Sequence, residues 1–319
     1  MTTAPVLLIV FNRPEHTQKM LESLLVQRPS ELYVFQDGPR VNNTYDLENC
    51  QLVRNVIEEQ LQNLSYDIIV HKYYSDINRG CRDAIIHAIT SVLEVHESVV
   101  IIEDDIVTSP AFLTYMNKAL DHYKNNMSVH SISGYSPSPG RFEIYDTYSY
   151  DVFASPRLFG WGWGTWRDRW FAVDWSMSYY DEFIRNTAQI EAFNRGGDDM
   201  TTMLIDEKEG RSSAWDVQFV FDQFKKHAVS IVPCVSYTKN IGCDGTGTHC
   251  SIVRINDSEL CQKTTLRWLD TLYFDKRIIN LLYNTFTKTR RPLWQKAINY
   301  IARKLGKKAP FVIKKKVYA

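Results

Sequence analysis

Three consecutive carboxylates, Glu103-Asp104-Asp105, directly follow the apolar run Val99–Ile102. Such a run predicts a buried central strand, so these carboxylates lie where burial and mutual repulsion both disfavour their charge. A hard divalent cation relieves both costs, and an ion held by one or two carboxylates is commonly completed by substrate phosphates. The carboxylate triplet therefore indicates a Mn²⁺ or Mg²⁺ site for a diphosphate. A solvated acidic turn is the alternative interpretation.

Two glycine-rich segments could bring the backbone close to a ligand. Leu158–Trp166 reads LFGWGWGTW, in which Trp161 and Trp163 offer flat apolar faces to a sugar ring. The alternative is a turn between elements with two core tryptophans. The second segment, Lys239–Cys250, reads KNIGCDGTGTHC and carries His249, although a lone histidine is more often a surface or packing residue.

These residues need a scaffold, and the first half of the chain supplies the pattern of stacked βαβ units. Strands are predicted at Val6–Phe11, Leu32–Phe35, Ile68–Tyr73, Val99–Ile102, Val129–Ser133 and Tyr148–Phe153. Helices are predicted from Pro14, over Leu47–Leu64 and Arg82–Glu94, and from Ser109-Pro110 to Lys124. The predicted fold class is α/β, an open, mostly parallel, Rossmann-like sheet with helices on both faces. Because such sheets bind ligands at the carboxyl ends of their strands, Asn12-Arg13, Asp37 and the carboxylate triplet should converge on one edge.

The second half is less regular. It contains a polar helical stretch, a helix, a short strand and two C-terminal helices, at Tyr179–Glu209, Asp216–Lys226, Ser230–Val232, Arg277–Phe286 and Pro292–Leu305. Apolar residues make up 44% and charged residues 23% of the chain, which excludes collagenous, disulfide-scaffold and disordered classes. The six cysteines form no CxxC pair, and neither a signal peptide nor a spanning apolar run is found. We therefore expect a cytoplasmic protein with reduced thiols.

The charge is distributed unevenly. Residues 276–319 carry 13 Lys and Arg and no acid, whereas residues 1–275 carry 24 Lys and Arg against 37 Asp and Glu. We expect a catalytic domain over residues 1–262 and a basic helical region over 263–319. The basic amphipathic helix and the lysine cluster Lys314–Lys316 favour contact with an anionic membrane surface, at the inner membrane face. Docking of the tail on the acidic body is the alternative.

Several motifs resemble those of GT-A glycosyltransferases. They are the stretch Pro5–Arg40, the strand that ends in the carboxylate triplet, and the loop and helix that follow. The resemblance is to the N-acetylglucosaminyltransferase I group, glycosyltransferase family 13, and to bacterial sugar transferases of capsule and lipopolysaccharide synthesis. It covers about residues 5 to 250 and implies the GT-A fold, a nucleotide-sugar donor and a divalent metal.

The resemblance also implies roles residue by residue. Asp37 matches the acid that pairs with the uracil ring, and Arg13 matches a residue at the uridine and phosphate site. Asp105 matches the direct metal ligand, with Glu103 nearby, and Asp104 matches the residue near the ribose.

Four further positions match more loosely. Asn78 lies in an Asn-x-Gly turn that resembles one before the helix preceding the metal motif, and Arg82 falls where the family places another donor-contacting side chain of a different type. Leu158–Trp163 resembles the family's glycine loop. His249 matches a C-terminal histidine that approaches the metal or the diphosphate.

Trp215-Asp216 resembles the family's Trp-Asp, in which the aspartate is the catalytic base. A structural role competes, because Ser213-Ala214-Trp215-Asp216 also fits a capping box, Ser-x-x-Asp. The two roles are compatible, and Asp181 is the fallback base.

The combined interpretation is a metal-dependent inverting glycosyltransferase. It would move a sugar from a UDP-sugar, with UDP-N-acetylglucosamine one candidate, to a hydroxyl of a glycan or lipid-linked glycan in bacterial surface polysaccharide synthesis, and no nucleic acid partner is expected. A sugar-1-phosphate nucleotidyltransferase is an alternative, but it would want a phosphate loop rich in Gly and Arg after the first strand, where this chain reads FNRPEHT. The other alternative is a catalytically inactive sugar- or membrane-binding module.

Overall fold

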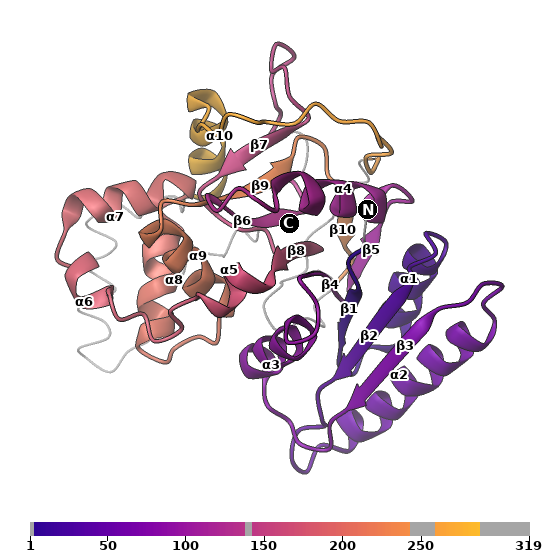
Figure 1. Ribbon diagram of the computed structural model, residues 1–319. Helices are drawn as coiled ribbons and strands as arrows, with labels where there is room; N and C mark the ends of the chain where they lie inside the picture. The colour runs from indigo at the N-terminus through magenta and orange to yellow at the C-terminus, as the bar shows by residue number, and fades with distance from the viewer. Residues whose placement is uncertain (1–2, 138–141, 243–258, 288–319) are drawn as a thin grey trace, which may run out of the picture.

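An open sheet forms the centre of the molecule. The computed structural model describes residues 3–137, 142–242 and 259–287, and within these ranges eight strands form one sheet (Figure 1). In spatial order they are β3 (Ile69–Tyr74), β2 (Glu31–Gln36), β1 (Val6–Val10), β4 (Ser98–Glu103), β8 (Trp163–Trp166), β6 (Val129–Ser133), β9 (Val229–Pro233) and β7 (Val152–Ser155).

Most of the sheet is parallel, as predicted. β1 pairs in parallel with both β2 and β4, and β2 with β3. β8 is antiparallel to β4 and β6, and β7 is antiparallel to β9. The carboxyl ends of β1, β2, β3 and β4 therefore meet at one edge, where the polar turns that follow them lie side by side.

Helices cover both faces, because successive residues of each strand point to opposite sides. Val6 and Leu8 belong to the hydrophobic cluster of one face, whereas Leu7 belongs to that of the other. The first cluster includes residues of α1 (Pro14–Leu25), α2 (Thr44–Gln62) and α4 (Phe112–Tyr123). The second includes residues of α3 (Cys81–Leu93), α5 (Arg167–Phe171), α6 (Tyr180–Phe183), α7 (Thr187–Phe193), α8 (Asp199–Lys208) and α9 (Trp215–Lys225).

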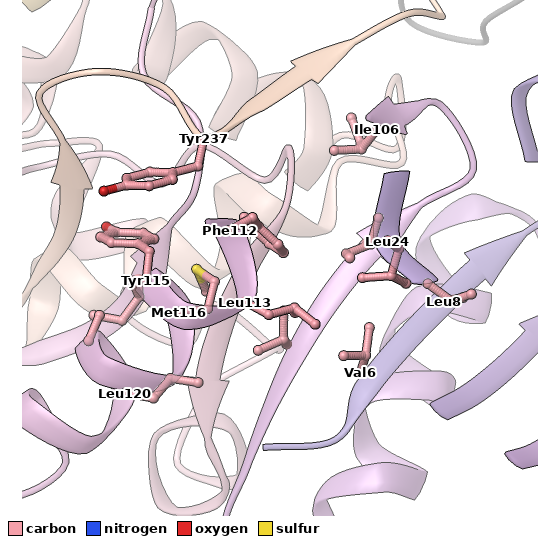
Figure 2. Packing of buried hydrophobic residues seen from close by; sticks show 14 of the residues in the cluster. Val6, Leu8, Leu24, Ile106, Phe112, Leu113, Tyr115, Met116, Leu120 and Tyr237 are labelled. Atoms are coloured by element: carbon pink, nitrogen blue, oxygen red, sulfur yellow. The ribbon is translucent and has the colours of Figure 1, made fainter. Parts of the chain in front are cut away.

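A short two-stranded ribbon extends from the end of β4. It pairs β5 (Ile106–Thr108) with β10 (Thr238–Asn240) in antiparallel fashion. Tyr237, which directly precedes β10, stacks on Tyr115 of α4 with ring centroids 4.4 Å apart (Figure 2). This packing fixes the chain that continues from β10 next to the carboxylate triplet.

The segment Leu158–Trp166 was predicted as a loop, but its second half is strand β8, in the middle of the sheet. The two tryptophans Trp163 and Trp166 are buried on opposite faces of this strand. Gly164 lets the strand approach β4, since an added Cβ would lie 2.9 Å from the carbonyl oxygen of Val99. Glycines lower the apparent strand propensity, so the pattern looks like a turn in the sequence.

Other differences concern the bounds of elements. The predicted helical stretch Tyr179–Glu209 is divided into α6, α7, the 3₁₀ turn η1 (Asn194–Gly196) and α8. The strand predicted at Tyr148–Phe153 begins only at Val152, and β5 and β10 were not predicted.

The C-terminal part packs on the sheet as far as the structure describes it. Leu269 is fully buried beside Tyr123, and α10 (Lys276–Phe286) buries Ile278 and Leu282. The guanidinium of Arg157 lies 4.0 Å from the ring centroid of Phe286. The predicted helix Pro292–Leu305 and the lysine cluster lie outside the described residues. Among the helices that are described, none combines the length and the apolar character needed to cross a membrane.

One buried histidine lies in the sheet. His130 of β6 is 3% exposed and packs edge-on against Phe219, with ring centroids 6.1 Å apart. Within the described structure its Nδ1 is buried and has no hydrogen-bond partner. Burial, with the positive charge of Lys226, lowers the pKa of His130 from 6.5 to about 4, although Asp222 opposes the shift.

His130 should make the fold sensitive to acid. Between pH 6.5 and pH 4 the unfolded chain binds more protons than the folded chain, so stability is fully present above pH 6.5 and falls as the pH decreases. The lowered pKa corresponds to a loss of up to about 3 kcal/mol. Urea unfolding at pH 7, 5.5 and 4.5 should show this slope in the wild type and a shallower one in His130→Leu. Equal slopes would contradict the role of His130.

Candidate active site

The carboxylate triplet lies at the end of β4, in the middle of the parallel strands. Asp104 and Asp105 are 3% and 8% exposed. Burial raises the pKa of Glu103 to about 8, with further contributions from Asp105 and Asp104 and a smaller one from Asp216. Burial also raises the pKa of Asp104, against the opposing charge of Arg13. The triplet is thus an electrostatically costly group that a cation would stabilise.

Arg13 provides the positive charge in this structure. It follows β1, and its Nη2 forms ion pairs with Asp104 and, at 3.1 Å, with Oδ2 of Asp105. Burial alone would lower the pKa of Arg13, but the charges of Asp104 and Asp105 outweigh it and raise the pKa. Among the described residues, its second nitrogen, Nη1, is buried and has no hydrogen-bond partner. That donor suits an anionic ligand at the same place.

The β5–β10 ribbon brings a second backbone segment against the triplet. The amide of Ile241 donates to the carbonyl oxygen of Asp105 at 2.8 Å, and the amide of Gly242 donates to Asn240 Oδ1 at 2.7 Å. A Cβ added at Gly242 would overlap the Asp105 carboxylate and lie 2.8 Å from Nη1 of Arg13. The Gly242 backbone therefore packs directly against the Asp105 carboxylate and the Arg13 guanidinium, and any side chain at this position would displace them. The rest of this loop, including His249, lies outside the described residues.

Asp37 shapes the turn that precedes α3. Its carboxylate accepts the amides of Arg79, at 2.9 Å, and Gly80, at 3.1 Å, and the Nδ2 group of Asn78, at 3.1 Å. Asn78 Nδ2 also donates to the carbonyl oxygen of Gly38 at 2.7 Å. Gly80 has φ +79°, a conformation that favours glycine. Asp37 and Asn78, both predicted at the nucleotide, thus lie together, and in this structure they hold the start of α3.

Asp216 lies in the first turn of α9. Its neighbour Trp215 stacks on Trp163 with ring centroids 5.0 Å apart. The capping-box interpretation predicted Ser213 as the cap, but α9 has Ala214 at the N-cap and no side-chain cap from that residue. The amide of Ala214 instead donates to Glu207 Oε2 at 2.7 Å. A residue of α8, and not a local capping box, therefore accepts the backbone amide at the start of α9.

The predicted base and the predicted metal ligands lie within electrostatic reach of one another. Desolvation of the thiol and then the charges of Glu103, Asp216, Asp104 and Asp37 raise the pKa of Cys81, at the start of α3, to about 12, although the residue as a whole is exposed. The Cys81 thiol therefore lies within electrostatic range of four carboxylates of the predicted site. They come from the ends of β2 and β4 and from the start of α9. The parallel strands β1, β2 and β4 place Arg13, Asp37 and the triplet at the one sheet edge that the sequence predicted.

Asp181, the fallback base, lies elsewhere. It is exposed on α6, a helix that packs through Phe183 on Phe221, with ring centroids 5.0 Å apart. Phe221 belongs to the later part of α9, whereas Asp216 belongs to its first turn. The structure favours Asp216 over Asp181 as the residue near the triplet.

The two predicted sugar-contacting tryptophans differ in their surroundings. Trp163 is 1% exposed and covered by Trp215, so its ring is part of the core and offers no open face to a sugar. The alternative interpretation of a core tryptophan therefore holds for Trp163. Trp161 is only partly buried and packs edge-on against Tyr135, with ring centroids 4.5 Å apart. Trp161 stays a candidate contact.

Arg82, predicted at the donor, is directed to other partners. Its Nε donates to Gln218 Oε1 at 2.9 Å and lies 3.3 Å from Glu207 Oε1. The sequence gave no sign of Glu207, because it belongs to a long polar stretch without a motif. It also missed Asp46, a fully buried residue that accepts from Asn12 Nδ2 at 2.7 Å and from the amide of Arg40 at 3.2 Å, and so braces the turns after β1 and β2. An acidic residue within an otherwise apolar helix face was the available signal for Asp46.

Asp105 and its neighbours fit a divalent cation. The fit rests on buried carboxylates with raised pKa values, on the close approach of the Gly242 backbone to the Asp105 carboxylate and on the unsatisfied donor of Arg13. Within the described residues no three His, Cys, Asp or Glu side chains are arranged to hold a metal by themselves. Cations at nucleotide sites are commonly held by one or two carboxylates together with phosphate oxygens.

Comparison with known proteins gives a family. The sequence model of the GNT-I family matches residues 1–228 of the chain, which confirms the resemblance seen in the motifs. A search of curated proteins finds no match.

Solved structures with some likeness include a UDP-glucose pyrophosphorylase complexed with UDP-glucose, at 10% identity and a TM-score of 0.38, covering 72% of this chain and 90% of that one. Another is a 4-diphosphocytidyl-2C-methyl-D-erythritol synthase from Anaerococcus prevotii, at 11% identity and a TM-score of 0.32, covering 58% and 77% of the two chains. A third is HddC from Yersinia pseudotuberculosis, at 7% identity and a TM-score of 0.30, covering 51% and 77%. These values are too low to support an argument about activity.

Gly242 offers a direct test of the space beside Asp105. In Gly242→Ala the new methyl group should push the Asp105 carboxylate and Arg13 aside, because it would overlap Oδ2 of Asp105 and lie 2.8 Å from Nη1 of Arg13 and 2.9 Å from Cβ of Asp105. Titration calorimetry of Mn²⁺ with UDP present should show an affinity about 10- to 100-fold weaker, the range found when groups that orient metal ligands are changed.

Gly160→Ala is the matched control for this substitution. Its Cβ would lie 3.8 Å from Trp215, an ordinary contact, so the Mn²⁺ affinity should stay near the wild-type value. Thermal melting of both variants separates displacement of the ligand from loss of folding. Unchanged Mn²⁺ affinity in a folded Gly242→Ala protein would contradict the placement of the metal beside Gly242.

Proposed function

The chain belongs to the GNT-I family, and from that premise we propose that it is a metal-dependent inverting glycosyltransferase. It moves a sugar from a UDP-sugar, with UDP-N-acetylglucosamine one candidate donor, to a hydroxyl of a glycan acceptor. The observation that carries the proposal is the gathering of the carboxylate triplet, Arg13, the Asp37 turn and Asp216 around one edge of the parallel sheet. A donor diphosphate and an acceptor hydroxyl can both be reached from that edge.

The donor end of the proposed site is formed by residues after β1, β2 and β4. A bound divalent cation, held by Asp105 and the diphosphate, would neutralise the charge that develops on the departing UDP. Arg13 would donate its Nη1 group to the same diphosphate, which would give that buried donor a partner. Asp104 would orient Arg13 through their ion pair while it lies beside the ribose. Asp37 and Asn78 would border the uracil through the turn they hold.

The acceptor end is proposed at the start of α9. Asp216 Oδ1 accepts the amide of Val217 at 2.9 Å, which orients the carboxylate on a helix that is packed through Trp215 on the core. As the acceptor oxygen attacks the anomeric carbon, Asp216 would take its proton, and the bond from that carbon to the UDP oxygen would break. A single displacement of this kind inverts the anomeric centre.

A glycan or lipid-linked glycan is the proposed acceptor, in the synthesis of a bacterial surface polysaccharide. The composition of the tail supports this choice, because 13 Lys and Arg without any acid after Asp275 would be attracted to an anionic lipid surface. The catalytic unit is proposed to comprise residues 1–262, and the basic region 263–319 to meet that surface from the cytoplasmic side.

The proposal is tested with a panel of nucleotide sugars and acceptors. We expect UDP release that requires Mn²⁺ or Mg²⁺, that stops with a chelator, and that increases when a glycan acceptor is offered on anionic vesicles rather than in detergent. Asp105→Ala should abolish the release while Asp121→Ala, which removes an exposed carboxylate of α4, should leave it unchanged.

Two outcomes of the panel would replace the proposal. Formation of a nucleotide sugar and pyrophosphate from a sugar 1-phosphate and a nucleoside triphosphate would establish the nucleotidyltransferase alternative. Nucleotide-sugar binding without turnover on any acceptor, by a folded protein, would indicate an inactive binding module.

The role of Asp216 is tested separately. Asp216→Asn keeps the shape of the side chain and its bond to the Val217 amide, so UDP affinity should stay within a few-fold. Turnover should fall roughly 10²- to 10⁴-fold, because the amide cannot accept the proton. The pair of rates for Asp216→Asn and Asp181→Asn decides the assignment: a loss of turnover only in the second variant would move the base to Asp181.

A further inference from the structure

Glu207 is a buried carboxylate with no part in the proposed chemistry. It lies near the end of α8, and its side chain is 6% exposed. Its Oε2 accepts the amide of Ala214 at 2.7 Å and the hydroxyl of Ser212 at 3.0 Å. Because Ala214 is the N-cap of α9, Glu207 satisfies a backbone donor at the start of that helix. The carboxylate thereby fixes the turn that leads into Asp216, two residues further on.

The other oxygen of Glu207 faces α3. Oε1 lies 3.3 Å from Nε of Arg82, and the same Nε donates to Oε1 of Gln218 at 2.9 Å. Gln218 is 3% exposed and belongs to the first half of α9. Arg82 therefore joins α3 both to α8 and to α9, through two buried acceptors.

The start of α3 is in turn held by the predicted nucleotide site. The amide of Gly80, at the N-cap of α3, donates to Asp37 at 3.1 Å. Arg82 follows two residues later. Hydrogen bonds and an ion pair, joined by the backbone from Gly80 to Arg82, thus connect Asp37 at the end of β2 with the N-cap of α9.

We propose that Glu207 is the positioning residue of the site, which sets the carboxylate of Asp216 relative to the donor by joining Arg82 of α3 to the N-cap of α9. The inference rests on the proposed function, since it concerns the geometry of the proposed base. Glu207 touches no reacting atom and acts through Asp216. Small displacements of a catalytic group lower the rate of the chemical step far more than they lower the affinity for a ligand bound elsewhere.

Two substitutions separate the contacts of Glu207. Glu207→Gln keeps a carbonyl oxygen for the Ala214 amide and loses the charge that faces Arg82, whereas Glu207→Ala loses both. We expect kcat to fall about 10-fold in the first and about 100-fold in the second. The affinity for UDP with Mn²⁺ should change less than 2-fold in both, because the donor residues remain in place. Glu209→Gln, an exposed change at the end of the same helix, is the matched control and should leave kcat unchanged.

A double-mutant cycle distinguishes positioning from general support of the fold. If Glu207 acts through Asp216, then Glu207→Gln should lower the residual rate of Asp216→Asn by less than 2-fold, although it lowers the wild-type rate about 10-fold. A purely structural role would lower both rates by the same factor and would weaken UDP binding as well. Should Glu207→Ala fail to fold, the Glu207→Gln cycle decides alone.

The outcomes also separate this inference from the proposed function. Wild-type turnover in Asp216→Asn would refute the base itself, whatever Glu207 does. An inactive Asp216→Asn together with wild-type kcat in both Glu207 variants would leave the base in place and overturn the positioning role. Equal losses in the two backgrounds of the cycle would also overturn it.

Discussion

Three adjacent carboxylates cannot be buried at the end of a central strand unless positive charge lies beside them. In this chain Arg13 supplies that charge, and the surrounding architecture follows from the requirement. The turn after β1 must bring Arg13 across to β4, and Asp104 fixes this turn by also accepting the amide of Phe11 at 3.3 Å. Gly242 must carry no side chain, because its Cβ position coincides with the ion pair. A site that holds an arginine in this way, with one guanidinium nitrogen still unsatisfied, is consistent with the proposed ligand, a cation together with phosphate oxygens.

Carboxylates also organise the backbone around the site, in a recurring manner. Asp37 binds the amides before α3, Asp46 binds the amide of Arg40 in the turn after β2, and Glu207 binds the amide before α9. Each of the three satisfies a backbone donor at a turn or at the start of a helix, where no intrahelical acceptor is available. The excess of acidic residues in residues 1–275 is thus partly explained by carboxylates that accept backbone amides in turns. The same side chains place negative charge around the edge of the sheet, and this again favours a cation there.

The sequence predicted the elements and residues whose signals are local. Strand β4 is a continuous apolar run, and the order of strands and helices follows from periodicity, so the sequence alone predicts Arg13, Asp37 and the triplet on one edge. The failures have tertiary causes. Trp163 was predicted to contact a sugar, because the glycines beside it made the segment look like a loop. The segment is strand β8, which is stabilised by pairing with β4 and β6. Ser213 fitted a helix cap in the sequence, but the N-cap of α9 is Ala214. The acceptor of the Ala214 amide is Glu207, seven residues earlier in the chain, and no local pattern indicates this contact.

Helix α3 is the element that both ends of the site share. Its start is held by Asp37, whose two oxygens already accept the amides of Arg79 and Gly80 and the Asn78 side chain. A carboxylate offers about four lone-pair positions, so a uracil N–H that binds to Asp37 must share it with this turn. Any change at Asp37 would therefore act on a nucleotide bound at the proposed site and on the placement of α3 together. Two residues after Gly80, Arg82 connects α3 with Glu207 and Gln218. Because both contacts belong to one helix, α3 holds the proposed donor site and the proposed base at a fixed separation.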